Sequence, residues 1–331
     1  MKPRINGLFG ILLLTAFCAN CEEDAARILN DNFEKREIKY YIDQNENKAD
    51  FLKEEVSIQK IEGEEAPCLL LCRCKVKFKP VPVQDSVKYR MSFESRADGI
   101  ETIETNPDLK HFLIGREQRL PNREYYFLDA EMKPVGVQGK RSLSIHTLPF
   151  GKWHETEDVF YPPAKAAFIQ VAFNAGSFEK ASLLIRKLKF TPAADEGALN
   201  CNPAFKLGKY NYSGWPEMYS ANFVEMDGKL FFEGGSGEPF PISEPGEYHI
   251  FAKGIPKNGE KAAIGIEFMD AQGKGMKGSS SVEPKPEGVS LNFKVPEGAK
   301  RAKLSSRNCI VEEVRVAPGG STAVSPEKNK P

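Results

Sequence analysis

Residues 289–304, VSLNFKVPEGAKRAKL, decide the fold. Apolar and polar side chains alternate up to a Pro-Glu-Gly turn, and a second alternating run follows, which is the pattern of two antiparallel strands joined by a turn. Residues 156–173, TEDVFYPPAKAAFIQVAF, repeat the same order of strand, proline-containing turn and strand. The chain therefore carries this strand–turn–strand unit twice.

The rest of the chain aligns in the same way. Each half begins with an Asn-containing segment that runs to a Phe, Ile28–Phe33 in the first half and Leu199–Phe205 in the second. Four further pairs of strand-like segments follow in the same order: Cys72–Pro82 with Lys229–Pro241, Val87–Phe93 with Glu247–Ala252, Tyr125–Ala130 with Ile266–Ala271, and Ser182–Pro192 with Cys309–Pro318. This shared order predicts a duplicated module.

Alternation with period two runs through nearly all of these segments, and Gly, Pro, Asn or Asp stands at the joins. That pattern is typical of antiparallel strands with one buried face, and it predicts an all-β protein built of two β-sandwiches in tandem. The predicted domains are residues 28–192 and 200–318, with a linker over 193–199. The tail, residues 319–331, has almost no apolar side chain to anchor it and is predicted to be disordered.

The balance of charge argues against nucleic acid as a partner. The 331 residues contain 46 Lys plus Arg and 46 Asp plus Glu, so no overall field attracts a polyanion. Basic tails and nucleic-acid-binding motifs are also absent from the sequence.

The first 21 residues read as a signal peptide. Lys2 and Arg4 precede a short apolar core, Gly7–Phe17, which is shorter than the roughly 20 residues that a membrane-spanning helix needs. The sequence thus predicts an exported protein that is at the cell surface, periplasmic or secreted. Cys18 and Cys21 are candidates for lipid acylation, which would be the sole contact with a membrane, and ordinary cleavage with free secretion is the alternative.

The chain resembles the galactose-binding-like jelly rolls, a group that includes many bacterial carbohydrate-binding modules. The resemblance lies in the N-x-x-F element of both halves, in the Tyr-rich strand after a Pro-bounded turn, and in the strand–turn–strand unit quoted above. Trp153 stands where such modules often have a Trp, whereas the second half has Glu-Gly-Val at 287–289 and departs from the pattern. The resemblance covers about residues 28–318 and implies two tandem jelly-roll β-sandwich domains.

The five cysteines beyond the signal segment are an odd number, so at least one thiol is unpaired within the chain. In a jelly roll the first and last strands are neighbours, which makes Cys201 and Cys309 a disulfide candidate, with two buried thiols as the alternative. Cys68, Cys72 and Cys74 lack zinc-site spacing and are interpreted as buried apolar residues.

Ligand-binding candidates come from two places. The densest aromatic stretch, residues 210–219, contains Tyr210, Tyr212, Trp215 and Tyr219, whose rings could stack on a sugar, although the resemblance favours a core position for Trp215. Comparison of the halves also indicates an insertion in the first half, around residues 102–122. It contains Arg116 and Arg119, and loops of this kind often carry binding residues.

Catalytic and cofactor motifs are not indicated. The chain has four histidines, no H-E-x-x-H and no G-x-S-x-G motif, and its G-x-G-x-x-G string at 273–278 is followed by serines and prolines rather than by a helix. We therefore expect no enzyme activity, no cofactor and no metal. A structural calcium ion would suit Asn30, Asp31, Asn200 and Asn202, but no oxygen-rich loop indicates one.

Two functions follow as hypotheses. The first is an exported, non-catalytic carbohydrate-binding protein at the cell surface, whose partner is a polysaccharide or another glycan. The second is a structural or protein-interaction module of the same fold without a sugar site. Because the first rests on fold resemblance, the sequence leaves both open.

Overall fold

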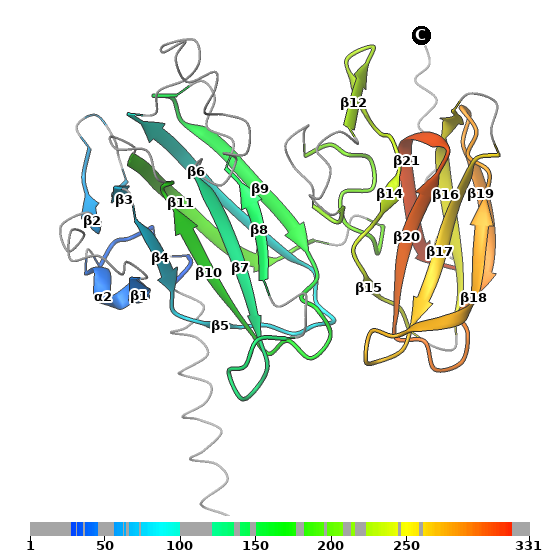
Figure 1. The fold of residues 1–331 in the computed structure, drawn as a ribbon, viewed down its shortest axis with the longest axis horizontal. Coiled ribbons are helices and arrows are strands. Elements are labelled where there is room, and N and C mark those ends of the chain that lie inside the picture. Colours follow the sequence, from blue (N-terminus) through cyan, green and yellow to red (C-terminus); the bar gives the residue numbers. More distant parts are fainter. Residues whose placement is uncertain are drawn as a thin grey trace, which may run out of the picture. The chain divides into compact units, whose positions relative to one another are not determined.

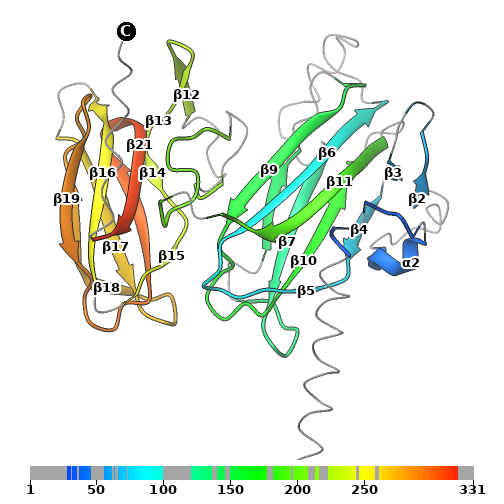
Figure 2. The ribbon, with the colours of Figure 1, turned by 180° about the vertical axis from the view of Figure 1, so that it is seen from behind.

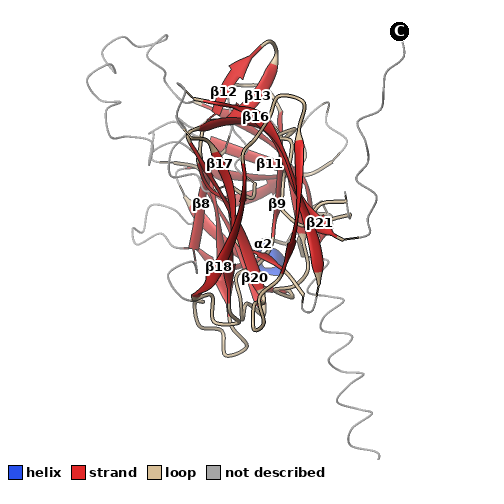
Figure 3. Cartoon of the chain, turned by 90° about the vertical axis from the view of Figure 1, so that its right-hand side faces the viewer, coloured by secondary structure: helices blue, strands red, loops and turns tan. Residues whose placement is uncertain are grey.

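The computed structural model contains almost only strands and turns. It describes residues 28–30, 32–35, 37–45, 56–61, 63, 66–72, 74–99, 121–135, 140–145, 150–176, 182–194, 197–207, 213–215, 223–243, 246–257 and 261–319. Among these residues the single helix is the one-turn α2 (Ile38–Tyr41), the blue element of Figure 3.

The chain divides into two compact units, and the boundary near the middle of the chain falls between Thr191 and Pro192. The first unit holds the described residues of Met1–Gln84, Met91–Thr156 and Lys165–Thr191. The second holds Asp85–Arg90, Glu157–Ala164 and the described residues from Pro192 onward. Two short segments of the first half therefore belong to the second unit, which the alternation of the sequence does not predict.

Two sheets make up the sandwich of the first half (Figure 1). One sheet has the order β1 (Ile42–Asn45), β4 (Lys75–Phe78), β10 (Phe168–Asn174), β7 (Asn122–Leu128) and β8 (Lys140–Ser144), and β5 (Val81–Pro82) pairs with β10. The other has the order β2 (Val56–Gln59), β3 (Cys68–Cys72), β11 (Ser182–Pro192), β6 (Tyr89–Asp98) and β9 (His154–Phe160).

The second half repeats this plan, as Figure 2 shows from behind. One sheet has the order β12 (Phe223–Met226), β13 (Lys229–Phe232), β21 (Cys309–Pro318), β16 (Glu247–Pro256) and β19 (Val289–Lys294). The other has the order β14 (Gly235–Ser236), β20 (Arg301–Arg307), β17 (Ala263–Met269) and β18 (Gly275–Val282), and β15 (Phe240–Pro241) pairs with β20.

The duplication is confirmed strand by strand. Adding ten to each label from β2 to β11 reproduces the strand order of both sheets in the second half. In each copy the first long strand lies beside the last, β3 beside β11 and β13 beside β21, as in a jelly roll. The all-β fold of two tandem jelly-roll β-sandwiches is thus confirmed, and β1 and α2 precede the repeated strands.

Alternation of side chains builds each core. In β6 every second residue is buried, and in β16 Tyr248, Ile250 and Ala252 alternate with more exposed neighbours. The strand-like segment Cys72–Pro82 is not one strand, however. It contains the end of β3 and then β4 and β5, which lie in the opposite sheet from β3. Cys68 and Cys74 are buried as predicted, whereas Cys72 is half-buried.

Equivalent asparagines join the two ends of each copy. Asn30 donates from Nδ2 to the carbonyl of Phe190 (2.9 Å) and accepts at Oδ1 from the amide of Phe190 (2.8 Å). Asn200 donates to the carbonyl of Val314 and accepts from the amide of Val316, both at 2.9 Å. Each asparagine completes the backbone hydrogen bonding of the copy's last strand, β11 or β21. Their amides are used in this way rather than held open for calcium.

Candidate ligand-binding pocket

The pocket is built on the segment 197–207, which enters the second sandwich. Its path is fixed against β21, because the amide of Leu199 donates to the carbonyl of Val316 (2.7 Å) and the amide of Val314 donates to the carbonyl of Pro203 (2.9 Å). The chain then turns at Asn202, whose φ of 46° lies in the left-handed region that Asn tolerates better than most residues. The Asn202 side chain closes this turn by accepting at Oδ1 from the amide of Leu207 (3.4 Å).

Residues 85–90 and 157–164 complete this part of the second unit. Lys88 donates from Nζ to the carbonyl of Ala198 (2.6 Å), and its own carbonyl accepts from the amide of Ala193 (2.8 Å). The amide of Val159 donates to the hydroxyl of Ser213 (2.8 Å). These bonds hold backbone and side chains from distant parts of the chain around one space.

Arg301 in β20 fixes the same two segments. Arg301 is 6% exposed, and its guanidinium donates to the carbonyls of Asp85 (3.2 Å), Pro162 (3.0 Å) and Pro239 (3.0 Å). Burial lowers the pKa of Arg301, and the nearby charge of Asp85 acts in the opposite direction. An arginine stays protonated at any working pH, so this contact is permanent.

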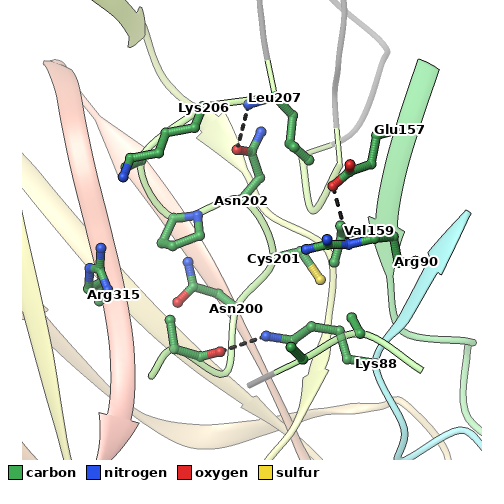
Figure 4. A pocket seen from close by; sticks show the side chains of 15 residues that line it. Lys88, Arg90, Glu157, Val159, Asn200, Cys201, Asn202, Lys206, Leu207 and Arg315 are labelled. Carbon is green, nitrogen blue, oxygen red and sulfur yellow. Dashed lines mark hydrogen bonds and ion pairs between the residues drawn. The ribbon is translucent and has the colours of Figure 1, made fainter. Parts of the chain in front are cut away.

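The enclosed space has a volume of about 360 Å³. Figure 4 shows Asn200 and Asn202 between Lys206 and Arg315 on one side and the Arg90–Glu157 pair on the other. The wall combines amide and charged groups with small or apolar side chains: Lys88, Arg90, Glu157, Val159, Ala193, Ala194, Ala198, Asn200, Cys201, Asn202, Pro203, Ala204, Lys206, Leu207 and Arg315.

Positive charge dominates this wall. Four cationic residues line it, Lys88, Arg90, Lys206 and Arg315, against the carboxylate of Glu157. Two of the four are in ion pairs: Arg90 with Glu157, at 3.3 Å between Nε and Oε1, and Arg315 with Glu313. Lys206 is exposed, and the ion pairs found among the described residues do not include it.

The Asn202 side chain leaves one of its two polar atoms without a hydrogen-bond partner. Asn202 is 7% exposed, and its Nδ2 is buried without a hydrogen-bond partner, while its Oδ1 is used by Leu207. Buried donors in folded proteins are nearly always paired with protein, water or ligand. The pocket therefore contains an unused donor beside an excess of cations.

Of the candidate ligand-binding residues, Trp215 is described, and it occupies the core position that the resemblance favoured over a binding role. It is 2% exposed and packs in the core of the second sandwich, with its ring centroid 4.5 Å from that of Phe232 and 5.5 Å from that of Phe205. The other candidates, Tyr210, Tyr212, Tyr219, Arg116 and Arg119, lie outside the described residues, as do the lipidation candidates Cys18 and Cys21.

Exposed aromatic rings are not found elsewhere in the described part of the chain. The exposed large hydrophobic side chains there are Met132 and Ile255, and neither has a ring. Trp153 is half-buried, and the guanidinium of Arg186 lies 3.9 Å from its ring centroid. The described surface thus offers a polar pocket rather than an open aromatic ring for stacking.

The Cys201–Cys309 disulfide candidate is corrected by the structure, in which both residues are buried thiols, the alternative given above, and do not form a disulfide. Cys201 lies in a turn rather than in a strand, next to the part of β21 around Val314. Cys309 begins β21 five residues earlier, about 15 Å away at the rise of an extended strand. A disulfide requires Cα atoms within about 7 Å of each other. Burial also raises the pKa of the Cys309 thiol.

Sequence reasoning missed most of the wall. Lys88, Arg90 and Glu157 are distant in sequence from the segment 197–207, and no local motif links them to it. Asn202 lies in the N-x-x-F element of the second half, and its left-handed turn has a counterpart at Asn32 in the first half.

Within the described residues, no three or more His, Cys, Asp or Glu side chains lie together as they would around a metal ion. In the same part of the chain, no helix has the length and apolar character needed to cross a bilayer.

Comparison with known proteins finds no family model and no curated protein that matches the chain. Among solved structures, the tandem CBM22-1–CBM22-2 domain of Paenibacillus barcinonensis Xyn10C is 9% identical, with 88% of this chain and 97% of that chain covered and a TM-score of 0.31. TmCBM61, solved in complex with β-1,4-galactotriose, is 12% identical over 49% of this chain and 94% of its own, also with a TM-score of 0.31.

A further similarity is to the enzymatically active domain of tailspike protein 4 from bacteriophage CBA120. It is 12% identical over 42% of this chain, with a TM-score of 0.30, and the match spans 18% of the tailspike chain. TM-scores of this size assign the chain to none of these groups.

Proposed function

We propose that the protein is an exported, non-catalytic protein that binds carbohydrate through the pocket of its second unit. The pocket carries this proposal, because it combines the amide of Asn202 and several cations with small apolar side chains such as Val159 and Pro203. The hydroxyl groups of a sugar would hydrogen-bond to the amide and the cations, and its C–H faces would pack on the apolar side chains. The hydrogen bonds of Asn200 to β21 keep this wall rigid, which lowers the entropic cost of binding.

The charges of the pocket favour binding without cleavage. Among the described residues of its wall, Glu157 is the one carboxylate, and it is paired with Arg90. Glycoside hydrolysis in most families uses two carboxyl groups that flank the scissile bond. A single, ion-paired carboxylate does not supply that pair.

Export is supported by the sequence. The charged start and short apolar core of residues 1–21 are typical of a signal peptide. The protein would then meet glycans at the cell surface, in the periplasm or as a secreted protein. Acylation of Cys18 or Cys21 would attach it to a membrane, and intact-mass measurement of the mature protein would detect the lipid.

A structural or protein-interaction module is the second candidate, and the absence of an exposed ring among the described residues favours it.

The two candidate functions are separated by screening the full chain on a glycan array. Ala204→Trp should abolish the signals, because the new ring enters a pocket that Ala204 lines. Ala271→Trp is the matched control, since Ala271 is an exposed turn residue outside the pocket. Uniformly absent binding by the unmodified chain would contradict the proposal and leave the second candidate.

A further inference from the structure

We propose that the pocket is specific for an anionic saccharide, a sugar unit whose carboxylate or sulfate group is bound by the Asn202 amide and the Lys206 ammonium. This inference rests on the proposed function and names the class of ligand. It depends on three features of the pocket: its excess of positive charge, its unpartnered donor and its size.

The excess of positive charge remains after the internal pairs are counted. The negative charge of Glu157 offsets the positive charge of Arg90, and that of Glu313 offsets the charge of Arg315. Lys88 donates to a neutral carbonyl, so its charge is not cancelled by that bond. Lys206 adds a second such charge at the exposed rim. A recess lined with charge of one sign concentrates ligands of the opposite sign.

The unpartnered donor gives the anion a defined place. The Oδ1 atom of Asn202 accepts from the amide of Leu207, and its buried Nδ2 has no hydrogen-bond partner in the protein. A carboxylate or sulfate oxygen would accept from this nitrogen, and a hydrogen bond to a charged partner is stronger than one to a neutral partner. Lys206, four residues further along the same turn, lies in the same wall and supplies the opposite charge.

The size of the pocket suits a sugar unit. Its volume of about 360 Å³ is at the small end of the range for small-molecule sites, which excludes a folded protein domain as the occupant. The apolar part of the wall, which includes Val159, Pro203 and Leu207, can cover the C–H face of a sugar ring. An inorganic anion alone would leave that part of the wall unused.

Asn202→Asp is the sharpest test. The substitution keeps the shape, the acceptor for the Leu207 amide and the tolerance of a left-handed backbone, but it replaces the unused donor by a negative charge. Calorimetric titration of the full chain with oligogalacturonates, sulfated galactan oligomers and uncharged galactan oligomers compares carboxylate, sulfate and neutral sugars. We expect binding of the charged sugars to weaken at least tenfold in this variant, while the thermal midpoint is unchanged or higher.

Lys206→Gln provides an independent test with a matched control. It removes one charge from the pocket, whereas Lys294→Gln removes one from an 82% exposed lysine in β19 of the same unit. We expect the first to weaken binding of the charged oligomers by a few-fold and the second to leave it unchanged. Equal effects of the two variants would show that binding follows net charge alone and would overturn the inference.

The outcomes also separate this inference from the proposed function. If the chain binds uncharged oligomers as tightly as charged ones, and Asn202→Asp has no effect on either, the anionic class is wrong while carbohydrate binding stands. If none of the three sugar types binds, the proposed function fails with it. Preference between the two charged types decides whether the anionic group is a carboxylate or a sulfate.

Discussion

Asn200 is the residue on which the pocket segment depends. It is 4% exposed and satisfies a donor and an acceptor of β21 at once. Asn200→Ala should destabilise the second unit by about 2–4 kcal/mol, because two buried backbone groups lose their partner. Urea unfolding of the full chain measures this loss. Asn292→Ala is the control, since Asn292 is exposed on β19 and its removal should change stability by less than about 0.5 kcal/mol.

Glu94 on β6 makes the stability of the first unit depend on pH. Burial alone would raise its pKa, but bonds from Lys187 and Arg186, each at 2.6 Å, together with their charges, lower it below the ordinary value. A carboxylate with a lowered folded pKa stabilises the protein above its unfolded pKa, near 4.3, and loses this contribution as pH falls through the folded pKa.

Glu94→Gln should therefore cost about 1 kcal/mol of stability at pH 7 and less at pH 3. Thermal unfolding at the two pH values measures the difference between the variant and the unmodified chain. Glu247→Gln is the comparison, because the Glu247 side chain is 73% exposed and lies 3.8 Å from Lys294. An equal loss for Glu94→Gln at both pH values would contradict the role given to its charge.

At the scale of elements, the β16–β21 pair depends on a glycine. The register of the two strands shifts at Lys253 and Gly254, where β21 contains an extra residue. A Cβ atom on Gly254 would lie 2.4 Å from the carbonyl oxygen of Ile310 and 3.1 Å from the Cα of Val311. The strands can approach this closely only because position 254 has no side chain.

Gly254→Ala should destabilise the second unit by about 1–3 kcal/mol, since backbone must move to admit the methyl group. Gly275→Ala in β18 should be neutral, because no atom lies within 4 Å of the place that its methyl group would occupy and its φ is not positive. The midpoints of urea unfolding compare the two variants directly. Equal midpoints would mean that β16 and β21 accommodate the methyl group without loss of stability.

Much of the strand arrangement could be predicted from the sequence. Period-two alternation located the strands and their duplication, because each sandwich buries one face of every strand. The break inside Cys72–Pro82 was missed, since a chain that passes from one sheet to the other keeps its apolar pattern. For Trp215 the sequence left a core and a binding role open, because a buried ring and an exposed ring give the same sequence signal. The pocket could not be predicted, because the residues that line it come together only in the tertiary structure.

At the scale of the whole molecule, Arg301 joins three separate stretches of chain. Its guanidinium bonds to the carbonyls of Asp85, Pro162 and Pro239, and it holds the segments 85–90 and 157–164 within the second unit. Methionine at this position would fill much of the volume but leave three carbonyl oxygens without their donor.

Arg301→Met should therefore speed hydrogen exchange in residues 85–90 and 157–164 more than in the strands of either core, and lower stability by about 3 kcal/mol. Hydrogen exchange followed by mass spectrometry resolves these peptides. Arg307→Met at the exposed end of the same strand, β20, should leave their exchange unchanged. Uniform acceleration over all peptides would assign the loss to global unfolding instead of to these segments.

The asparagine bridges also set the order of events during synthesis. Asn30 and Phe190 are 160 positions apart, and Asn200 and Val316 are 116 apart, so each copy makes its closing bonds with a strand that the ribosome delivers last. The first copy can close as soon as its final strand emerges, whereas the bonds of Lys88, Asp85 and Pro162 to Ala198 and Arg301 form only after those later residues are translated. A nascent chain halted between the two copies would lack these bonds, and residues 85–90 and 157–164 would be more accessible to chaperones and proteases.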